Sequence, residues 1–534
     1  MISHIQNVLM KSIFSNWRSD LPASLVVFLV ALPLCLGVGL ASTSVEIDGM
    51  PNIFSGIIAG VIGGIIVGFS SGSRLGVSGP AAGLIAIVAA AIVTIGSFEG
   101  FLLAVVLSGA IQLVAGFAGA GVLGNYFPSS VIKGMLAAIG ITLILKEIPH
   151  ALGYDADFMG DESFLQADGH NTFSELYYAV KALHPGAIIV SVLSLLILIL
   201  FDKPFMKQFA IFKILPGALF VVILGIVLNM AFGLFDPAYV IAGKHLVQLP
   251  VAGNFSDVVS FFSFPDFSFF SNPNVYVVAF TIALVGSLET LLSVEATDKL
   301  DPEKHHTPTN RELKAQGIGN IASGLLGGLP ITQVIVRSSA NINSGGKSKL
   351  STILHGVLLI ITVLFIPKVL NMIPLASLAA ILLMVGYKLS KVQLYKSMLK
   401  LGYEQFIPFI MTIIAVLFSD LLKGIAVGMA FAIFYILRKN YRNNYRTEIE
   451  ETQTRKHIII QLSEEVTFLN KGSIIDLLEE LEEGSTVTID ACNCHMIDHD
   501  VLEIIQDFKD FGAKEKNITF NTINVPEVSV TGAH

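Results

Sequence analysis

The sequence predicts a polytopic α-helical membrane protein that carries a small α/β domain after its last membrane span. Of its 534 residues, 53% are hydrophobic and only 14% are charged, and the mean hydropathy is +0.72. This balance is typical of a chain whose solvent is the lipid bilayer. Apolar runs of spanning length recur up to residue 438, and the composition becomes charged and amphipathic after Arg446. The predicted domains are therefore a transmembrane domain, 1–446, and a cytoplasmic domain, 447–534.

About fourteen apolar runs, separated by Gly, Pro or charged residues, are long enough to count as membrane segments when the short ones are included. The third and the tenth are interrupted or preceded by Gly and Pro, so each half of a seven-plus-seven chain has a defective third span. This is the arrangement expected of an inverted repeat with broken helices. The predicted segments are 21–41, 52–70, 76–95, 99–120, 129–148, 185–201, 212–233, 275–295, 312–328, 331–343, 350–368, 374–388, 403–420 and 422–438, with ends uncertain by about four residues.

The distribution of basic residues predicts the orientation, because Lys and Arg in short loops stay on the cytoplasmic side. Both termini are then cytoplasmic, and we expect a multi-pass protein of a bacterial inner membrane. Residues 1–20 form a mixed amphipathic stretch without the features of a cleavable signal. Two long loops fall outside: 149–184 is acidic, and the Phe-rich 234–274 is expected to fold back on the membrane surface. The basic residues assigned to the cytoplasm are Arg74, Lys133, Lys203, Lys207, Arg311, Lys347, Lys349, Lys388, Lys391, Arg438, Lys439, Arg442 and Arg446.

The C-terminal region alternates between strand and helix patterns, which predicts a small α/β domain with parallel strands. It has no phosphate-binding Gly loop. The chain shows no pairing of a nucleophile with a base and no metal triad, so we expect neither an enzyme nor a cofactor. The predicted order is a strand at His457–Leu462, a helix at Lys471–Leu481, a strand at Thr486–Asp490, a helix at Asp500–Gly512 and a strand at Asn517–Asn521.

The three cysteines and the net charge exclude two further classes of protein. Cys35, Cys492 and Cys494 cannot build a disulfide framework, and the Cys-x-Cys pair has no partner pair for a metal, so buried thiols are favoured. A net charge of −8 argues against nucleic-acid binding.

Two short motifs place glycines and a proline directly before a short helical run. We call Gly76–Gly83 (GVSGPAAG) the third-span motif and Gly327–Gln333 (GGLPITQ) the tenth-span motif. A half-helix that begins in mid-membrane directs free backbone N–H groups and a partial positive dipole at one point, which can hold an anion. The alternative is that Gly and Pro only kink two ordinary helices. The predicted anion-binding residues are Ser78, Gly79, Ala81, Ile331, Thr332, Gln333 and Arg337.

Arg337 follows Thr332 by five residues, and we place it near the inner end of the tenth span. Its charge would attract anions, or its long side chain would snorkel to the cytoplasmic surface.

Glu289 lies well inside the eighth apolar run, where a carboxylate costs several kcal/mol unless it is compensated. Beside an anion site it would repel the substrate, and a cation or a proton would relieve the repulsion. We therefore predict a sodium site at Glu289 and Ser293, with Thr290 and backbone carbonyls of the tenth span as further oxygen ligands. Prior cation binding would then favour the anion, which is symport. The alternative is a buried ion pair between Glu289 and Arg337.

The polar residues after the eighth span are predicted to be solvated. Glu295, Asp298 and Asp301 are expected at a solvated interface, and His305 and His306 in an exposed polar loop.

Four motifs together resemble the SulP (sulfate permease) family with its C-terminal STAS domain, over nearly the whole chain. They are Val30–Leu34 (VALPL), Val77–Pro80 (VSGP), Glu289–Ser293 (ETLLS) and Gly327–Pro330 (GGLP). The first and third look like those of the sodium-dependent bicarbonate transporters. These carry Asp in place of Glu289 and Thr in place of Ser293, both as sodium ligands. Many sulfate and dicarboxylate relatives have Gln where this chain has Leu34, so this position favours bicarbonate.

The resemblance implies two inverted seven-span repeats, with a core domain that holds the third and tenth spans and moves like an elevator against a gate domain. It also implies a homodimer stabilised through the C-terminal domain. In regulatory STAS relatives a phosphorylatable Ser follows an Asp at the second helix, whereas this chain reads Ile497–Asp500 (IDHD). A role in dimerisation is therefore expected rather than control by a kinase.

The function expected from these observations is sodium-coupled uptake of bicarbonate by a secondary transporter. The alternatives are proton- or sodium-coupled transport of sulfate or a dicarboxylate, transport of a nucleobase, and a membrane-anchored interaction module in which the C-terminal domain is the working part. The expected partners are a small inorganic anion, membrane lipid and a second copy of the chain.

Overall fold

The structure is a computed structural model that describes residues 16–43, 53–159, 164, 170–203, 216–249, 251, 259, 261–442, 445–452 and 455–526. Most of the predicted amphipathic N-terminal stretch, 1–15, lies outside these residues. The chain divides into two compact units, Met1–Met429 and Ala430–His534. This division falls inside helix α21 (Leu421–Arg442), and the predicted domain boundary after residue 446 stays a prediction. The two units are described separately.

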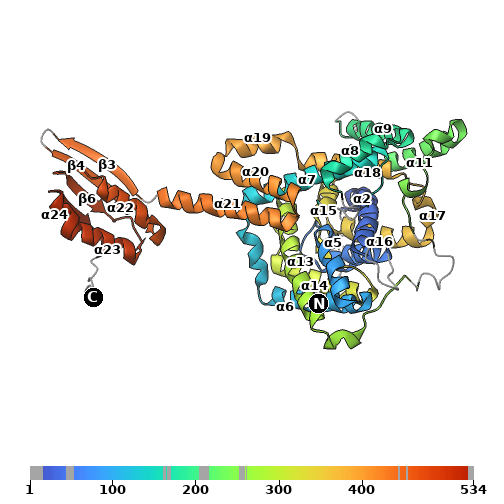
Figure 1. The fold of residues 1–534 in the computed structure, drawn as a ribbon, viewed down its shortest axis with the longest axis horizontal. Coiled ribbons are helices and arrows are strands. Elements are labelled where there is room, and N and C mark those ends of the chain that lie inside the picture. The colour runs from blue at the N-terminus through green and yellow to red at the C-terminus, as the bar shows by residue number, and fades with distance from the viewer. Residues whose placement is uncertain are drawn as a thin grey trace. The chain divides into compact units, whose positions relative to one another are not determined.

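Among its described residues, unit 1 has helices and two three-residue strands (Figure 1). Each of the fourteen predicted segments contains helix, and the segments 76–95 and 331–343 also contain the two strands. Its elements are α2 (Trp17–Thr43), α3 (Ile53–Ile62), the π-helix η1 (Gly63–Val67), α4 (Gly68–Ser70), β1 (Ser78–Pro80), η2 (Ala82–Leu84), α5 (Ile85–Ile95), α6 (Phe98–Phe117), η3 (Ala120–Tyr126), α7 (Ser129–Leu152), α8 (Thr172–Lys181), α9 (Pro185–Phe201), α11 (Gly217–Phe235), η5 (Pro237–Tyr239), η6 (Gly243–His245), η7 (Phe267–Ser271), α13 (Pro273–Leu300), α14 (Thr309–Leu326), β2 (Ile331–Gln333), α15 (Ile335–Asn343), α16 (Lys349–Phe365), α17 (Pro367–Leu370), α18 (Leu375–Leu389), α19 (Val392–Lys400), α20 (Tyr403–Phe418) and the start of α21.

Several of these helices have the length and composition needed to cross a membrane by themselves. Within the described residues there are six of them, or seven if the bent pair α8 and α9 counts as one span. Four further apolar helices are shorter, at 10–17 residues. The fold is thus that of a polytopic helical membrane protein, and the count of fourteen spans stays a prediction.

Two helices of unit 1 were not predicted from the sequence. Helix α8 lies in the long loop 149–184, begins with a capping box at Asn171 and makes an angle of 116° with α9. Helix α19 follows α18 and carries charged residues along its length. Both are short and amphipathic, so a search for apolar runs of membrane length does not detect them.

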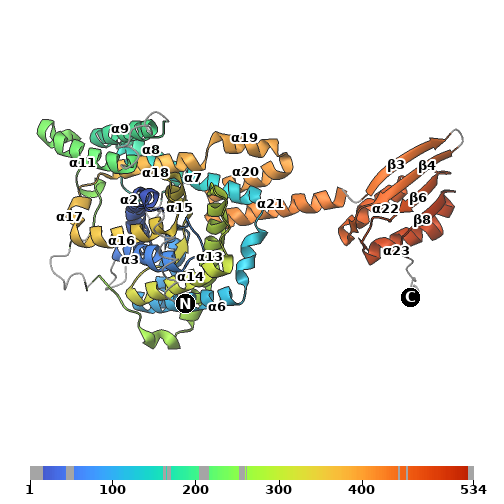
Figure 2. The ribbon, with the colours of Figure 1, turned by 180° about the vertical axis from the view of Figure 1, so that it is seen from behind.

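The helices of unit 1 pack in two groups. In one, α6 packs against α13 and α14, and α2 packs against α3, α15 and α16. In the other, α7 packs against α18 and α20, and α9 against α11 and α18. Both views place α2 and α15 together in the interior of the unit (Figure 1 and Figure 2), and Figure 1 shows α5 close to them. The two strands therefore lie in the group that contains α2.

Unit 2 contains a four-stranded sheet in the order β3-β4-β6-β8, with helices α22 (Lys471–Glu479) and α23 (His499–Asp507) between its parallel strands. The three predicted strands correspond to β4 (Arg455–Leu462), β6 (Thr486–Asp490) and β8 (Thr519–Ile523), and they are parallel as predicted. The remaining elements are β5 (Glu465–Val466), η8 (Phe468–Asn470), β7 (Met496–Ile497), η9 (Phe508–Gly512) and α24 (Ala513–Glu515).

Strand β3 (Tyr445–Thr452) was missed, because its charged sequence does not read as a buried strand. It pairs antiparallel with β4 along an edge of the sheet. The core of unit 2 includes Ile460 and Ile489 from the sheet and Ile474 and Ile505 from the helices. The unit therefore has a hydrophobic core of its own.

The Cys-x-Cys pair was predicted to consist of buried thiols. This is wrong for Cys492, which is exposed, while Cys494 is half-buried and Cys35 is buried. All three are free cysteines. Cys492 lies directly after β6, in a turn that the polar side chain of Asp490 stabilises by accepting a hydrogen bond from the Cys492 N–H.

Candidate functional site: two broken segments paired in the helical core

The third-span and tenth-span motifs do not continue as helices. Each contributes a short extended segment, and the two segments pair antiparallel as β1 and β2. Ser78 lies opposite Gln333, Gly79 opposite Thr332, and Pro80 opposite Ile331. Helix α5 begins a few residues after β1, and α15 begins two residues after β2. The alternative that both motifs only kink continuous helices is therefore wrong.

Helix α14 fixes the tenth-span strand with buried amides. The Asn320 side chain accepts a hydrogen bond from the Ile331 N–H at 2.6 Å and donates one to the Ile331 carbonyl at 3.0 Å. It also donates to Gln112 Oε1 at 2.7 Å. The Asn320 side chain thus satisfies both the N–H and the C=O group of Ile331, which does not lie in a longer sheet that could provide these partners.

The third-span strand is held by α14 and by the helices that follow β2. Gln316 Nε2 donates to Ser78 Oγ at 2.8 Å. Ser338 Oγ accepts from the Val77 N–H at 3.0 Å, and Asn341 Nδ2 donates to the Leu75 carbonyl at 3.0 Å. These contacts hold the chain extended between residues 75 and 80. They replace the backbone hydrogen bonds that a helix would have formed there.

Arg337 lies in the first turn of α15 and is 1% exposed. The alternative in which its side chain snorkels to the cytoplasmic surface is therefore wrong, while its position near the inner end of the span stays a prediction. Its guanidinium lies against Gly79, and a Cβ atom at that glycine would collide with Nη1. A permanent positive charge is thus buried beside the residue that pairs with Thr332.

Three polar atoms around the strand pair lack a hydrogen-bond partner within the described part of the chain. They are Thr332 Oγ1, Gln333 Oε1 and Arg337 Nη1, and all three residues are buried. Native proteins rarely leave buried polar atoms unsatisfied, and such atoms call for an explanation. A hydroxyl and a cationic N–H group at one strand pair are groups that can donate to an anion.

Glu289 lies on α13 and is 6% exposed. Its carboxylate packs against Gly83 of the third-span motif, where a Cβ atom would lie 3.3 Å from both carboxylate oxygens. Thr290 Oγ1 accepts a hydrogen bond from the Gln333 N–H at 3.3 Å, and the Ser293 carbonyl accepts from Gln333 Nε2 at 3.4 Å. The three residues of the predicted cation site therefore border both broken segments.

The predicted site residues are brought together, although their roles stay predictions. Ser78, Gly79, Thr332 and Gln333 lie in the strand pair and Arg337 lies beside it, whereas Ala81 follows β1 as a buried residue. The Ile331 backbone is already occupied by Asn320. The amides of α14, Gln316 and Asn320, were missed. The feature of the sequence that could have identified them is two amide side chains four residues apart within a segment long enough to span the membrane.

The acidic residues after Glu289 are less solvated than predicted. Asp301 is buried, and it accepts a hydrogen bond from His305 Nδ1 at 2.8 Å. Asp298 is half-buried and accepts from the Thr307 N–H at 2.6 Å and from Thr307 Oγ1 at 2.7 Å. The loop after α13 thus folds back onto its acidic side chains, while His306 is exposed as predicted.

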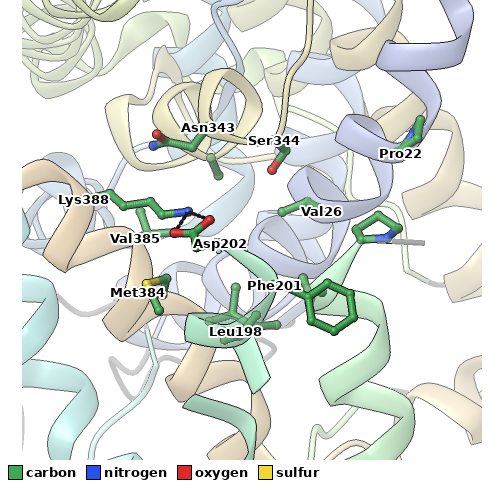
Figure 3. Close-up of a pocket in the computed structure, with 15 residues that line it drawn as sticks. Pro22, Val26, Leu198, Phe201, Asp202, Asn343, Ser344, Met384, Val385 and Lys388 are labelled. Atoms are coloured by element: carbon green, nitrogen blue, oxygen red, sulfur yellow. Dashed lines mark hydrogen bonds and ion pairs between the residues drawn. The ribbon is translucent and has the colours of Figure 1, made fainter. Parts of the chain in front are cut away.

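A cavity of about 210 Å³ opens between the two groups of helices (Figure 3). It is lined by residues of α2, α9, α11, α15 and α18, and none of the predicted site residues lines it. Lys388 and Asp202 form an ion pair at 3.0 Å across it. Asn343 and Ser344, at the end of α15, also line it, so the cavity reaches the C-terminal end of the helix that carries Arg337 in its first turn.

Paired broken segments, a buried arginine and a buried carboxylate within many apolar helices define a multi-pass membrane transport protein rather than an enzyme. The sequence profile of the Sulfate permease family matches residues 17–434, and the chain belongs to this family of anion transporters.

Known proteins of this kind resemble the chain over most of its length. It is 29% identical to the "Putative sulfate transporter YvdB" of Bacillus subtilis, over 79% of this chain and 74% of that protein. It is 26% identical to the bicarbonate transporter BicA of Picosynechococcus, over 88% of this chain and 78% of that protein. A solved structure of SLC26A9 has the same fold, with a TM-score of 0.64, 15% identity, and coverage of 98% of this chain and 89% of that one.

Proposed function

We propose that the chain is a sodium-coupled symporter of bicarbonate, in which the strand pair and Arg337 bind the anion and Glu289, Thr290 and Ser293 bind sodium. The observation that carries the proposal is that two side chains of opposite charge contact the same broken span. Arg337 lies against Gly79 and Glu289 against Gly83, four residues further along the same segment.

The electrostatics of this arrangement favour coupling. Four residues of extended chain span at most about 13 Å. At this distance and an effective dielectric of about 20, one negative charge changes the binding free energy of a monovalent anion by about 1.3 kcal/mol, or roughly tenfold in affinity. Sodium bound at Glu289 would remove this penalty, so each ion would favour binding of the other.

We further propose fourteen spans in two inverted halves, with the core and gate domains moving as an elevator. The antiparallel pairing of β1 and β2 supports the inversion, since the same part of each half meets its counterpart head to tail. The C-terminal α/β domain is proposed to be STAS-like and to stabilise a homodimer. The proposed location is a bacterial inner membrane, with both termini in the cytoplasm and the apolar outer helix faces in lipid.

The second candidate is transport of sulfate or a dicarboxylate coupled to protons or sodium. It is favoured by the similarity to a protein named as a sulfate transporter. In this case Glu289 would take up a proton instead of sodium. The buried arginine fits either anion, so the substrate has to be identified by transport itself.

The test is uptake of labelled bicarbonate and of labelled sulfate by proteoliposomes with and without an inward sodium gradient, for the unmodified chain and for Glu289→Gln. We expect sodium to stimulate bicarbonate uptake, and Glu289→Gln to abolish this stimulation and most of the transport. Sodium-stimulated uptake that is unchanged in Glu289→Gln would remove this carboxylate from the mechanism. Sulfate uptake driven by a proton gradient would favour the second candidate.

A further inference from the structure

Helix α13 carries a line of oxygen-bearing side chains that continues well past the proposed sodium site. Glu289, Ser293, Thr297 and Asp301 are spaced by four residues, and each is at most 6% exposed. In a helix of 3.6 residues per turn such residues lie above one another with a drift of about 40° per step, so they form a stripe that winds slowly around the helix over about 18 Å. Asp301 is the C-cap residue at the end of this stripe. We call these four residues the oxygen column. Burying polar or charged groups of this kind beside apolar helices costs free energy. Thr297 and Asp301 are not among the residues proposed to bind the anion, so the anion site does not explain their burial.

Gln333 borders the column at its middle. Its Nε2 donates to Thr297 Oγ1 at 3.0 Å, and Thr297 Oγ1 donates to the Ser293 carbonyl at 2.6 Å. Gln333 is fully buried, and its Oε1 has no hydrogen-bond partner within the described residues. A Cβ atom on Gly76 would lie 2.6 Å from this Oε1 and 2.7 Å from Ser73 Oγ. The missing side chain at Gly76 thus leaves two oxygens facing one small space.

The column ends at a cavity of about 150 Å³ that we call the Asp298 cavity. Its lining includes Thr297, Asp298 and Asp301 from the end of α13, and Ser73 from the segment before β1. Thr297 connects this cavity to the oxygen column, and Ser73 connects it to the space beside Gly76. It shares no lining residue with the cavity in Figure 3.

The charges around the Asp298 cavity suit a cation. Two carboxylates face it against the single guanidinium of Arg74, with His305 and His306 as the other ionisable groups. With neutral imidazoles the lining is net negative, which repels anions and raises the local concentration of cations. Carboxylate, hydroxyl and amide oxygens are also the ligands that hard cations prefer.

We propose that the oxygen column and the Asp298 cavity form a separate path by which the coupling cation moves between Glu289 and the side of the membrane on which residues 297–307 lie. This inference rests on the proposed function, because it takes Glu289 as the cation site. A cation on this path passes Ser293, Thr297 and the Gln333 carbonyl. It does not have to pass the positive charge of Arg337.

The first test narrows the path at Gly76. Gly76→Ala places a methyl group against Gln333 Oε1 and Ser73 Oγ, at 2.6 and 2.7 Å, so these side chains have to shift. Gly76 does not have a positive φ, so alanine does not strain the backbone there. Exchange is measured in proteoliposomes of one orientation. We expect a five- to tenfold rise in the half-saturating sodium concentration on the side of residues 297–307. On the other side we expect less than a twofold change.

The second variant removes charge instead of space. Asp298→Asn should produce the same one-sided rise, of about threefold. The matched controls are Gly233→Ala, at an exposed glycine of α11 with no atom near its Cβ position, and Asp420→Asn, at the junction of α20 and α21. Both should leave the sodium dependence on either side unchanged. An equal shift on both sides, or a change in the anion KM alone, would overturn the path.

A labelling experiment reads the path without relying on transport. Thr297→Cys is made in a chain whose three native cysteines are replaced by serine, and it is treated from the side of residues 297–307 with membrane-impermeant thiol reagents. A cationic reagent should modify it at least tenfold faster than an anionic one of similar size. Sodium should slow the reaction, and Glu289→Gln should remove this protection.

The outcomes separate the path from the proposed function. No labelling of Thr297→Cys, or equal labelling by both reagents, refutes the path even if Glu289→Gln abolishes sodium-stimulated uptake. Unchanged sodium-stimulated uptake in Glu289→Gln refutes the proposed function, and the path as a route for the coupling ion falls with it.

Discussion

At the scale of single residues, two glycines of the third-span motif determine which charged group approaches the strand pair. Gly79 makes room for Arg337, and Gly83 makes room for the Glu289 carboxylate. Neither glycine has a positive φ, so what these positions require is space rather than an unusual backbone. Adding one methyl group at each position therefore tests the two proposed ion sites independently.

We expect Gly79→Ala and Gly83→Ala to have different effects. Alanine at Gly79 displaces the Arg337 guanidinium and should raise the anion KM about tenfold, equivalent to about 1.4 kcal/mol, with little change in the half-saturating sodium concentration. Alanine at Gly83 touches the carboxylate at 3.3 Å and should raise the half-saturating sodium concentration several-fold at an unchanged anion KM. Uptake kinetics measured with each ion varied in turn separate the two. If both variants shift both constants equally, the assignment of separate anion and cation groups is wrong.

The sequence was sufficient to find these residues but not their neighbours. Gly, Pro and a buried carboxylate stand out against apolar runs, because each is costly there. The burial of Arg337 was not predictable, since the same spacing allows its side chain to reach the membrane surface. The contact with Gly79 depends on the pairing of two segments that are more than 250 residues apart.

At the scale of elements, the tenth-span strand is held by one side chain of a neighbouring helix. Asn320 of α14 makes both hydrogen bonds to the Ile331 backbone and a third to Gln112. Such a contact between distant segments cannot be predicted from helical periodicity. The same limitation explains why α8 and α19 were missed: their amphipathic patterns become meaningful only against the helices that they cover.

Asn320→Ala should therefore destabilise unit 1. It leaves the buried N–H and C=O groups of Ile331 without partners, which costs about 1–3 kcal/mol for each group. We expect the apparent melting temperature in detergent to fall by several degrees and uptake to be largely lost. Asn274→Ala, at an exposed asparagine near the start of α13, is the matched control and should leave both unchanged. A stable Asn320→Ala protein with normal uptake would show that the strand pair forms without this amide.

A second element-scale contact joins the end of α7 to the segment before α13. Asp155 is buried and accepts hydrogen bonds from His150 Nδ1 and His245 Nδ1, each at 2.5 Å. Burial raises the pKa of Asp155, but these two hydrogen bonds outweigh it and hold the pKa below its usual range. A carboxyl group whose pKa is lowered on folding stabilises the folded state above its unfolded pKa of about 3.9 and loses this effect as the pH falls through the folded value.

Burial lowers the pKa of His150, but the hydrogen bond to Asp155 and the nearby carboxylates outweigh it and raise this pKa to about 9. Asp155→Asn should consequently lower the thermal stability most between about pH 4 and about pH 6.5, and the loss should become smaller as the pH rises from about 6.5 towards 9 and His150 deprotonates. The difference from the unmodified chain should shrink below about pH 4, where the native carboxyl also becomes neutral. His245→Gln, which removes one of the two hydrogen bonds, should show a smaller loss. The measurement is the apparent melting temperature in detergent at each pH. A difference that grows as the pH falls below about 4 would contradict the role given to this carboxyl group.

At the scale of the whole molecule, the proposed binding residues lie in one unit, and the other unit has a hydrophobic core of its own. The strand pair, Arg337 and Glu289 all lie within Met1–Met429. The sheet and helices of unit 2 enclose their own hydrophobic core. The sequence predicted a transmembrane domain and a separate C-terminal domain because apolar runs of membrane length occur only in the first. It did not predict β3, so a boundary at residue 446 cuts into that strand.

Deletion of residues 443–534, after the end of α21, tests whether transport belongs to unit 1 alone. If the chain is a transporter, the truncated protein should keep sodium-stimulated anion uptake within about threefold of the full chain per molecule, because every proposed binding residue is retained. If the C-terminal domain stabilises a homodimer, the truncated protein should also dissociate at a higher concentration than the full chain, as measured by light scattering in detergent. The matched control is a full-length chain with Ile460→Asp, which places a charge in the core of unit 2 and should unfold that domain only. Loss of all uptake in both proteins, with unit 1 still folded, would instead make the C-terminal domain a working part of the transporter, since the spans would then depend on it to move.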